Sequence, residues 1–278
     1  MKYSLLSVFT IFAPRQPMCY DKSYLTKKQE KYAKRYGDGP DEVKFVQEQL
    51  FKLNMGPVFH ASGFTHPNVP VMIDHTKTIH LFSWGLIPYW VKSPKEAVEI
   101  SNRTINARAE TMFEKPAFRE PARNRRCLIL IDGFFEHHHK NKKVFPYYVQ
   151  LKDGSPITLA GLWDEWKDEM SGIVRRTYTV VTTQANPLMT RIHNNPKLEA
   201  GPRMPLILPK EREQNWLNPI HEKADQDLIE SLVQPYDEKE LEAFTVRRLR
   251  GKEAIGNKPE AVQSFRYSEL EESQGTLF

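Results

Sequence analysis

The chain has 278 residues, 40% hydrophobic and 27% charged, which is typical of a globular protein with a substantial core. Two cysteines are too few for a disulfide framework or a cysteine-rich zinc site, so a reducing, cytoplasmic setting is expected. The net charge of +5 is modest, but four arginines fall within residues 119–126, a pattern compatible with nucleic-acid binding and equally typical of a solvated surface. Apolar runs stay below the roughly 18 residues of a membrane span, so no membrane association is expected.

The N-terminal segment imitates a signal peptide. Residues 1–13, MKYSLLSVFTIFA, place Lys2 before an apolar run, but PRQP follows without a small-x-small cleavage site. Met18 and Cys19 come next. Three interpretations stay open on these residues alone: a secretion signal, a native extension, or an upstream start codon wrongly chosen for a chain that begins at Met18.

Residues 25–53 predict two short amphipathic helices, separated by YGDGPD. Five later segments are rich in β-branched and aromatic residues and predict strands, at 77–90, 126–139, 145–154, 157–166 and 176–185. A short helix is predicted over 186–194, with Asn186 as its N-cap and Pro187 in its first turn.

Beyond this helix, strands are predicted at 204–208 and 244–250, and helices at 210–217 and 223–232. The sequence has no internal repeat. The predicted fold class is α+β, a strongly bent, mainly antiparallel β-sheet or barrel with peripheral helices. We expect residues 18–268 to form one domain, 269–278 to form a polar tail, and 1–17 to be dispensable or misassigned.

Three polar residues interrupt apolar segments. Asn106 and Arg108 lie two apart in TINARAET, hence on one side of an extended segment, although a turn residue and a surface charge explain them as well. Glu136 ends an apolar run that predicts a buried strand, where an unpaired carboxylate is costly. Such a group suits proton transfer, and a structural ion pair explains it equally well.

The histidines and Cys127 suggest less. His193 follows the short helix, and nothing local distinguishes it from a structural or exposed histidine. His137, His138 and His139 are consecutive on a predicted strand, so they point to opposite faces and cannot converge on one metal ion. Cys127 is interpreted as a small core residue. No nucleotide, zinc-protease or nucleophile-elbow motif is present, and no cofactor or metal is expected.

Taken together, eight motifs resemble the SRAP family, the SOS response-associated peptidases or abasic-site processing proteins. They occur in family order and spacing from Met18 to Leu208, with a weaker match to about Phe265: MCY, WGLIPYW, NARAET, FRE…RRCLILIDGFFE, ITLAGLWDEW, TVVTTQAN, IHN and RMPLIL. The resemblance implies a protein that loses its initiator methionine, binds single-stranded DNA containing an abasic site, and crosslinks to it through an N-terminal cysteine. A monomer is the simplest expectation.

The implied chemistry fits the residue. An α-amine titrates near about pH 8 and a free thiol near about 8.5, so both are partly nucleophilic at neutral pH. The amine condenses with the C1′ aldehyde of the opened sugar, and the thiol of the same residue then closes a five-membered thiazolidine ring, an intramolecular step favoured by proximity. Only a cysteine at the N-terminus offers both groups.

The resemblance also implies roles for particular residues. Cys19 is the nucleophile, and Asn106 orients its amine. Glu136 and His193 are the acid/base pair. The DNA-binding residues are Arg108, which holds a backbone phosphate, Arg119, which contributes to the same groove, and Trp84, which either stacks on a base or lies in the core.

The chain departs from the family in three places. Many members read Met-Cys-Gly-Arg where this chain has Met18-Cys19-Tyr20-Asp21, so an early arginine is missing and an acid stands nearby. The usual tryptophan after the glutamate is His137, and the link between His193 and the RMP strand is longer than usual.

Alternative functions are a cysteine peptidase with Cys19 as nucleophile and His193 as base, capable of removing residues 1–18 itself, and a non-catalytic single-stranded DNA-binding module. The interpretation as a secreted protein is supported by the apolar N-terminal run alone. The required amine exists only if Cys19 becomes residue one. We therefore predict a misassigned start as the first explanation of residues 1–17, a removable propeptide as the second and a signal peptide as the third.

Overall fold

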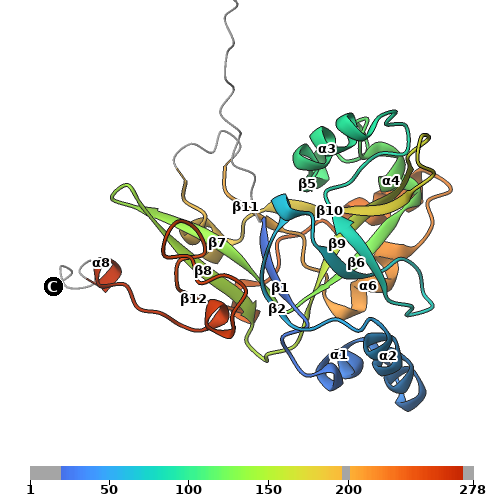
Figure 1. The fold of residues 1–278 in the computed structure, drawn as a ribbon. Helices are drawn as coiled ribbons and strands as arrows, with labels where there is room; N and C mark the ends of the chain where they lie inside the picture. Colours follow the sequence, from blue (N-terminus) through green and yellow to red (C-terminus); the bar gives the residue numbers. More distant parts are fainter. Residues whose placement is uncertain (1–19, 196–200, 272–278) are drawn as a thin grey trace, which may run out of the picture.

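The computed structural model describes residues 20–195 and 201–271 of the chain, and two β-sheets with helices packed around them make up the fold (Figure 1). Cys19 and residues 196–200 therefore lie outside the described residues.

The first sheet closes into a barrel. Its strands pair in the order β10-β4-β3-β6-β9, and β9 pairs back onto β10. All of these pairs are antiparallel except β10 with β4. The strands are β3 (Asn68–Met72), β4 (His80–Trp84), β6 (Arg126–Ile131), β9 (Ile157–Lys167) and β10 (Val174–Gln184). Two short strands extend β10, namely β5 (Asn106–Arg108) in parallel and β11 (Arg203–Pro205) antiparallel.

The second sheet has five antiparallel strands in the order β12-β8-β7-β1-β2. They are β1 (Asp21–Tyr24), β2 (Val58–Ser62), β7 (Gly133–Lys140), β8 (Lys143–Leu151) and β12 (Leu241–Thr245). In Figure 1 the long hairpin of β7 and β8 extends away from the barrel. β1 lies between β2 and β7, and one face of it packs toward the barrel, where Tyr24 and Phe134 join a shared core with Trp84.

The chain passes from the barrel to the second sheet at Asp132. This carboxylate is fully buried, and it accepts hydrogen bonds from the Thr26 backbone N–H (2.6 Å) and hydroxyl (2.7 Å). At Gly133 a Cβ would lie 2.4 Å from the Tyr148 ring, so only glycine fits this approach. The apolar run 126–139, predicted as one strand, is therefore two strands in two different sheets.

Most of the helices pack on the outside of the barrel, whereas the last one lies beside the second sheet, where Glu269 pairs with Lys143 (Figure 1). The α-helices are α1 (Gln29–Tyr36), α2 (Pro40–Lys52), α3 (Pro94–Arg103), α4 (Arg119–Asn124), α5 (Pro187–Ile192), α6 (Lys210–Leu217), α7 (Lys223–Ser231) and α8 (Ser268–Glu271). Short 3-10 turns occur at Gly63–Thr65, Ala109–Thr111, Glu238–Glu240 and Pro259–Val262. Among residues 20–195 and 201–271, no helix has the length and apolar character needed to cross a bilayer.

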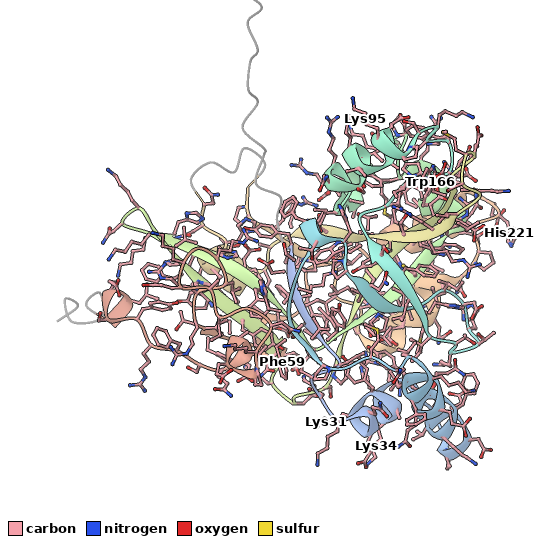
Figure 2. All side chains as sticks on the ribbon, viewed as in Figure 1. Lys31, Lys34, Phe59, Lys95, Trp166 and His221 are labelled. Carbon is pink, nitrogen blue, oxygen red and sulfur yellow. The ribbon has the colours of Figure 1, made fainter. Side chains whose placement is uncertain are left out.

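Amphipathic patterning explains how the helices pack. Tyr32 of α1, Leu50 of α2 and Trp216 of α6 are buried in a second core against the barrel, while Lys31 and Lys34 extend from α1 into solvent (Figure 2). Trp166 of β9 shares a small core with Ala97 of α3, and its indole donates to the carbonyl oxygen of Val91, which precedes the helix, at 2.8 Å.

The predicted fold class, α+β with a mainly antiparallel barrel and peripheral helices, is confirmed. The predicted strand at 244–250 is instead β12, at 241–245, and β1, β2 and β3 were not predicted. The predicted tail begins with ordered residues, because Glu269 forms an ion pair with Lys143 (3.0 Å) and its carbonyl accepts from Lys140 (2.8 Å).

Candidate active site

Glu136 and His193 meet in a buried site. Glu136 stands on β7, and His193 follows α5, yet His193 Nδ1 lies 3.5 Å from Glu136 Oε2. Their side chains are only 4% and 5% exposed. Glu136 Oε1 also accepts a hydrogen bond from the His137 backbone N–H at 3.0 Å. A carboxylate and an imidazole in contact and shielded from water form a pair able to move protons.

Local structure places His193 at this point. Asn186 caps α5 through a hydrogen bond from the Met189 N–H (2.8 Å), which confirms the predicted cap, and the His193 N–H donates to the Met189 carbonyl (2.7 Å) at the other end. The segment beyond is tied to β7: the His139 N–H donates to Asn194 Oδ1 (2.7 Å), and Asn194 donates back to the His139 carbonyl (2.9 Å). This reciprocal pair holds the segment after α5 alongside the strand of Glu136.

The tautomer of His193 follows from its partners. Nδ1 lies 3.1 Å from the Arg203 carbonyl oxygen, which can only accept, so Nδ1 carries the proton when the ring is neutral. Nε2 is then the nitrogen able to take a proton.

Asn106 and Arg108 lie on β5, next to β10. Asn106 is half-buried and Arg108 is exposed. The exposed position of Arg108 suits a solvated surface charge and a contact with DNA equally well. The 3-10 turn that follows β5 is connected to the Glu136–His193 pair through Arg203, which was not singled out from the sequence. The Arg203 guanidinium binds both Glu110 carboxylate oxygens, at 2.9 and 2.7 Å, while the Arg203 carbonyl binds His193.

Cys19 lies outside the described residues, but its neighbour Tyr20 is described. Tyr20 leads into β1, which pairs with β7 so that Asp21 is opposite Phe135. The Tyr20 ring stacks on His137, the residue after Glu136, with ring centroids 5.7 Å apart. The chain therefore enters the second sheet directly beside the strand that carries Glu136.

Trp84 lies in the core, so the base-stacking role for this residue is wrong. Its side chain has no exposed surface, its indole donates to the Ile105 carbonyl (2.9 Å), and the Lys22 ammonium covers the ring at 3.7 Å. A base would reach this ring only if the core opened. Tyr89 and Trp90, later in the same WGLIPYW motif, are 56% and 38% exposed.

Arg119 begins α4 and is exposed. The described contacts do not bring it against Glu136, His193 or β5, so its DNA-binding role stays a prediction. Cys127 is fully buried, as expected of a core residue, and burial raises the pKa of its thiol.

The residues that depart from the family pattern have partners close by in the fold. Asp21 is fully buried and paired with Arg250 (2.8 Å) and His60 (3.2 Å). His137 packs on Tyr20. Part of the longer link after His193, residues 196–200, lies outside the described residues.

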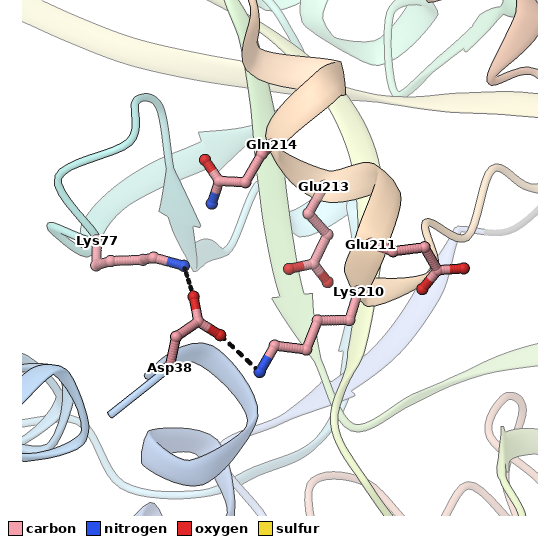
Figure 3. A pocket seen from close by; sticks show the side chains of 6 residues that line it. All are labelled: Asp38, Lys77, Lys210, Glu211, Glu213 and Gln214. Carbon is pink, nitrogen blue, oxygen red and sulfur yellow. Dashed lines mark hydrogen bonds and ion pairs between the residues drawn. The ribbon is translucent and has the colours of Figure 1, made fainter. Parts of the chain in front are cut away.

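A separate cavity of about 410 Å³ lies where α6 approaches the turn between α1 and α2 (Figure 3). It is lined by Asp38, Lys77, Lys210, Glu211, Glu213 and Gln214. Asp38 pairs with both lysines, at 3.4 and 2.8 Å, and so balances one of their two positive charges. None of the predicted site residues lines it.

Comparisons with known proteins agree on one family. The family model for the SOS response associated peptidase (SRAP) matches residues 18–252. The abasic site processing protein YoqW of Bacillus subtilis is 40% identical over 182 residues, which cover 65% of this chain and 74% of YoqW. The abasic site processing protein HMCES of Xenopus tropicalis is 33% identical over 154 residues, 49% of this chain and 43% of HMCES.

A crystal structure of a protein from Bacteroides thetaiotaomicron is also similar, with a TM-score of 0.73 and 36% identity, covering 89% of this chain and all of that one. The family match spans most of the chain and includes Met18, Cys19 and the residues of the Glu136–His193 site. This chain belongs to the SRAP family.

Proposed function

We propose that this protein processes abasic sites by binding single-stranded DNA and forming a covalent thiazolidine crosslink through Cys19 as its first residue. The observation that carries the proposal is the buried pair of Glu136 and His193, beside the point where the chain joins the second sheet at Tyr20. The names of the relatives YoqW and HMCES, both abasic site processing proteins, support the same substrate.

The reaction releases one water. The Cys19 α-amine attacks the C1′ aldehyde to give a carbinolamine, whose hydroxyl leaves as water when it gains a proton, which produces the Schiff base. The thiol then adds to the C=N carbon, and its proton passes to the nitrogen. One C–N and one C–S bond have formed.

Two proton movements in this sequence need a partner. The amine must lose a proton as it adds, and His193 Nε2 is the available acceptor if Nδ1 is held by the Arg203 carbonyl. The departing hydroxyl must gain one, and the Glu136–His193 pair is the source. Asn106 on β5 would orient the amine, while Arg108 and Arg119 would bind phosphates on either side of the lesion.

A self-processing peptidase activity is a second candidate, because the family description names a peptidase and the same imidazole can activate a thiol. In that case the Cys19 thiol attacks the Met18 carbonyl carbon, and the C–N bond breaks to give a thioester and the free Cys19 α-amine. Water then hydrolyses the thioester, which releases residues 1–18 and leaves the α-amine and thiol that crosslinking requires. This activity precedes crosslinking and does not replace it.

The test compares chains that start at Met1 and at Met18, each incubated with single-stranded DNA containing one abasic site. We expect an adduct that survives denaturation from the chain whose mature first residue is Cys19, and none from Cys19→Ala. Reversible, salt-sensitive binding without an adduct would instead identify a non-catalytic DNA-binding module. Conversion of the Met1 chain to a Cys19 start by the purified protein alone would establish self-processing.

A further inference from the structure

Tyr20, the residue after the proposed nucleophile, is held on several sides. The Arg250 guanidinium lies over its ring, 4.0 Å from the centroid, and Arg250 Nη1 donates to its hydroxyl at 2.6 Å. His137 stacks on the ring, and Phe64 packs against it with centroids 5.6 Å apart. The Tyr20 carbonyl accepts from the Gly63 N–H at 2.7 Å. Backbone and ring are thus both fixed.

The same arginine fixes the next residue. Arg250 Nη2 binds Asp21 Oδ2 at 2.8 Å, and His60 Nε2 lies 3.2 Å from the other oxygen. Asp21 has no exposed surface, so its charge depends on these partners. One planar guanidinium with several donors therefore joins the side chains of two consecutive residues, a geometry that a single ammonium group does not reproduce.

Arg250 comes from the far end of the chain. Val246 and Leu249 are buried against Phe135 and Tyr148, and they dock this C-terminal segment on the second sheet. The Arg250 side chain stays 45% exposed, so it does not fill the core. The contacts described for its side chain are with Tyr20 and Asp21, at the start of β1.

We propose that Arg250 is a positioning residue for the N-terminal cysteine. This inference rests on the proposed crosslinking function. Cys19 is bonded directly to Tyr20, and a trans peptide separates consecutive Cα atoms by about 3.8 Å, so fixing Tyr20 would restrain the Cys19 amine and thiol. Arg250 binds Asp21, which stands where many family members carry an arginine. The role is orientation of the α-amine and thiol, since at least two of its donors are already bound to protein.

Arg248 offers a matched control in the same segment. It also pairs with a carboxylate, Glu253, at 3.0 Å, and it also lies near an aromatic ring, Tyr267 at 5.8 Å, but it has no described contact with Tyr20 or Asp21. Arg248→Ala removes the same charge as Arg250→Ala without touching the start of β1.

The experiment measures single-turnover crosslinking of the Cys19-first chain at increasing concentrations of abasic single-stranded DNA. Arg250→Ala should lower the maximal rate about tenfold or more, because small misplacements of reacting groups are costly, with the half-saturating DNA concentration changed less than about twofold. Arg250→Lys should recover part of the rate. Arg248→Ala should retain the maximal rate. Thermal melting confirms that each variant is folded.

Two results would overturn the inference. A raised half-saturating concentration with an unchanged maximal rate would make Arg250 a DNA contact, and equal rates for Arg250→Ala and the wild type would make it structural only. Glyoxylate, a small aldehyde that requires no DNA site, separates these failures from failure of the proposed function. If the wild type forms no DNA adduct, the positioning role still predicts slower thiazolidine formation with glyoxylate in Arg250→Ala than in Arg248→Ala, and equal rates refute it.

Discussion

His193 Nδ1 lies 3.5 Å from Glu136 Oε2 and 3.1 Å from the Arg203 carbonyl, with both side chains nearly inaccessible to water. The imidazole is therefore oriented by one neutral and one acidic acceptor, and Nε2 is the nitrogen left to exchange protons. Loss of the acidic acceptor should therefore slow the proton transfers of crosslinking.

Glu136→Gln should lower the maximal crosslinking rate about 100-fold, within the range that general acid-base catalysis contributes, while DNA affinity changes less than about twofold. Glutamine retains the size of the side chain and an oxygen for the His137 N–H, so folding is preserved. Single-turnover kinetics at saturating DNA check this. Glu165→Gln, which removes an exposed, ion-paired carboxylate on β9, is the control and should have no effect. A Glu136→Gln rate within about threefold of wild type would exclude the acid/base role.

Arg108→Ala should weaken DNA binding and reduce the salt dependence of the affinity. Removing one phosphate interaction with a single strand lowers the slope of log K against log salt by about 0.7. Arg119→Ala tests the second predicted phosphate-binding residue in the same way. Lys34→Ala on α1, whose ammonium pairs with Glu30 at 2.6 Å, is the control (Figure 2). Fluorescence anisotropy with a short single strand at several salt concentrations measures the slope, and an unchanged slope would remove that arginine from the interface.

Trp84→Ala should lower the free energy of unfolding by about 3 to 5 kcal/mol, because it empties a fully buried site and removes an indole hydrogen bond. Trp90→Ala, at a partly exposed position of the same motif, should cost less stability. Urea denaturation gives both values. Weakened DNA binding by a Trp84→Ala protein of wild-type stability would restore the stacking role that the buried position argues against.

His137 should make stability fall at mildly acidic pH. Desolvation lowers its pKa and outweighs the opposing effect of the Glu136 and Asp21 carboxylates, and the nearby Arg250 and His139 lower it further. Because the unfolded chain then binds a proton at a higher pH than the folded one, stability is complete above the ordinary histidine pKa of about 6.5 and is lost as the pH falls below it.

His137→Asn should flatten this dependence between about pH 7 and 5, where one proton contributes at most about 1.4 kcal/mol per pH unit. Denaturant unfolding at a series of pH values measures it. Burial and the charge of Arg176 also lower the pKa of His80. The stability of a protein with both His80 and His137 replaced by asparagine should therefore depend on pH still less. A His137→Asn protein with the wild-type slope would contradict the assignment.

The sequence predicted the barrel strands β4, β6, β9 and β10 because their apolar runs are long, but it missed β3. It predicted α5 because Asn186 and Pro187 mark its start. It did not predict β1, whose residues DKSY include three polar side chains. All four are buried, since Asp21 pairs with Arg250, Lys22 covers Trp84 and Ser23 binds the Tyr148 hydroxyl at 2.8 Å. Each partner is distant in sequence, so no local pattern announces this strand.

In the candidate site, too, local patterns predicted some features and contacts between distant residues produced the others. Glu136 stood out as a carboxylate at the end of an apolar run, and family resemblance singled out His193. Their contact depends on the exchange of hydrogen bonds between His139 and Asn194, which no pattern predicts. Two further ion pairs likewise became apparent only from the fold, namely Arg203 with Glu110 and Arg250 with Asp21. The choice between core and base-stacking positions for Trp84 stayed open in the sequence, because the exposure of an aromatic residue cannot be read from its motif, and the fold places it in the core.

Crosslinking as proposed requires that the α-amine and thiol of Cys19 both bond to the abasic sugar. Intact mass spectrometry of the adduct tests this most directly, using the Cys19-first chain, its Cys19→Ser variant and a chain that retains Met18. We predict that the Cys19-first chain gives, without any reductant, a stable species with the summed mass of protein and DNA minus one water. Cys19→Ser should need borohydride to trap its Schiff base, and the Met18 chain should yield no thiazolidine. A stable, unreduced adduct of the Cys19→Ser chain at its own summed mass with the DNA minus one water, or no such adduct from the Cys19-first chain, would contradict the proposed chemistry.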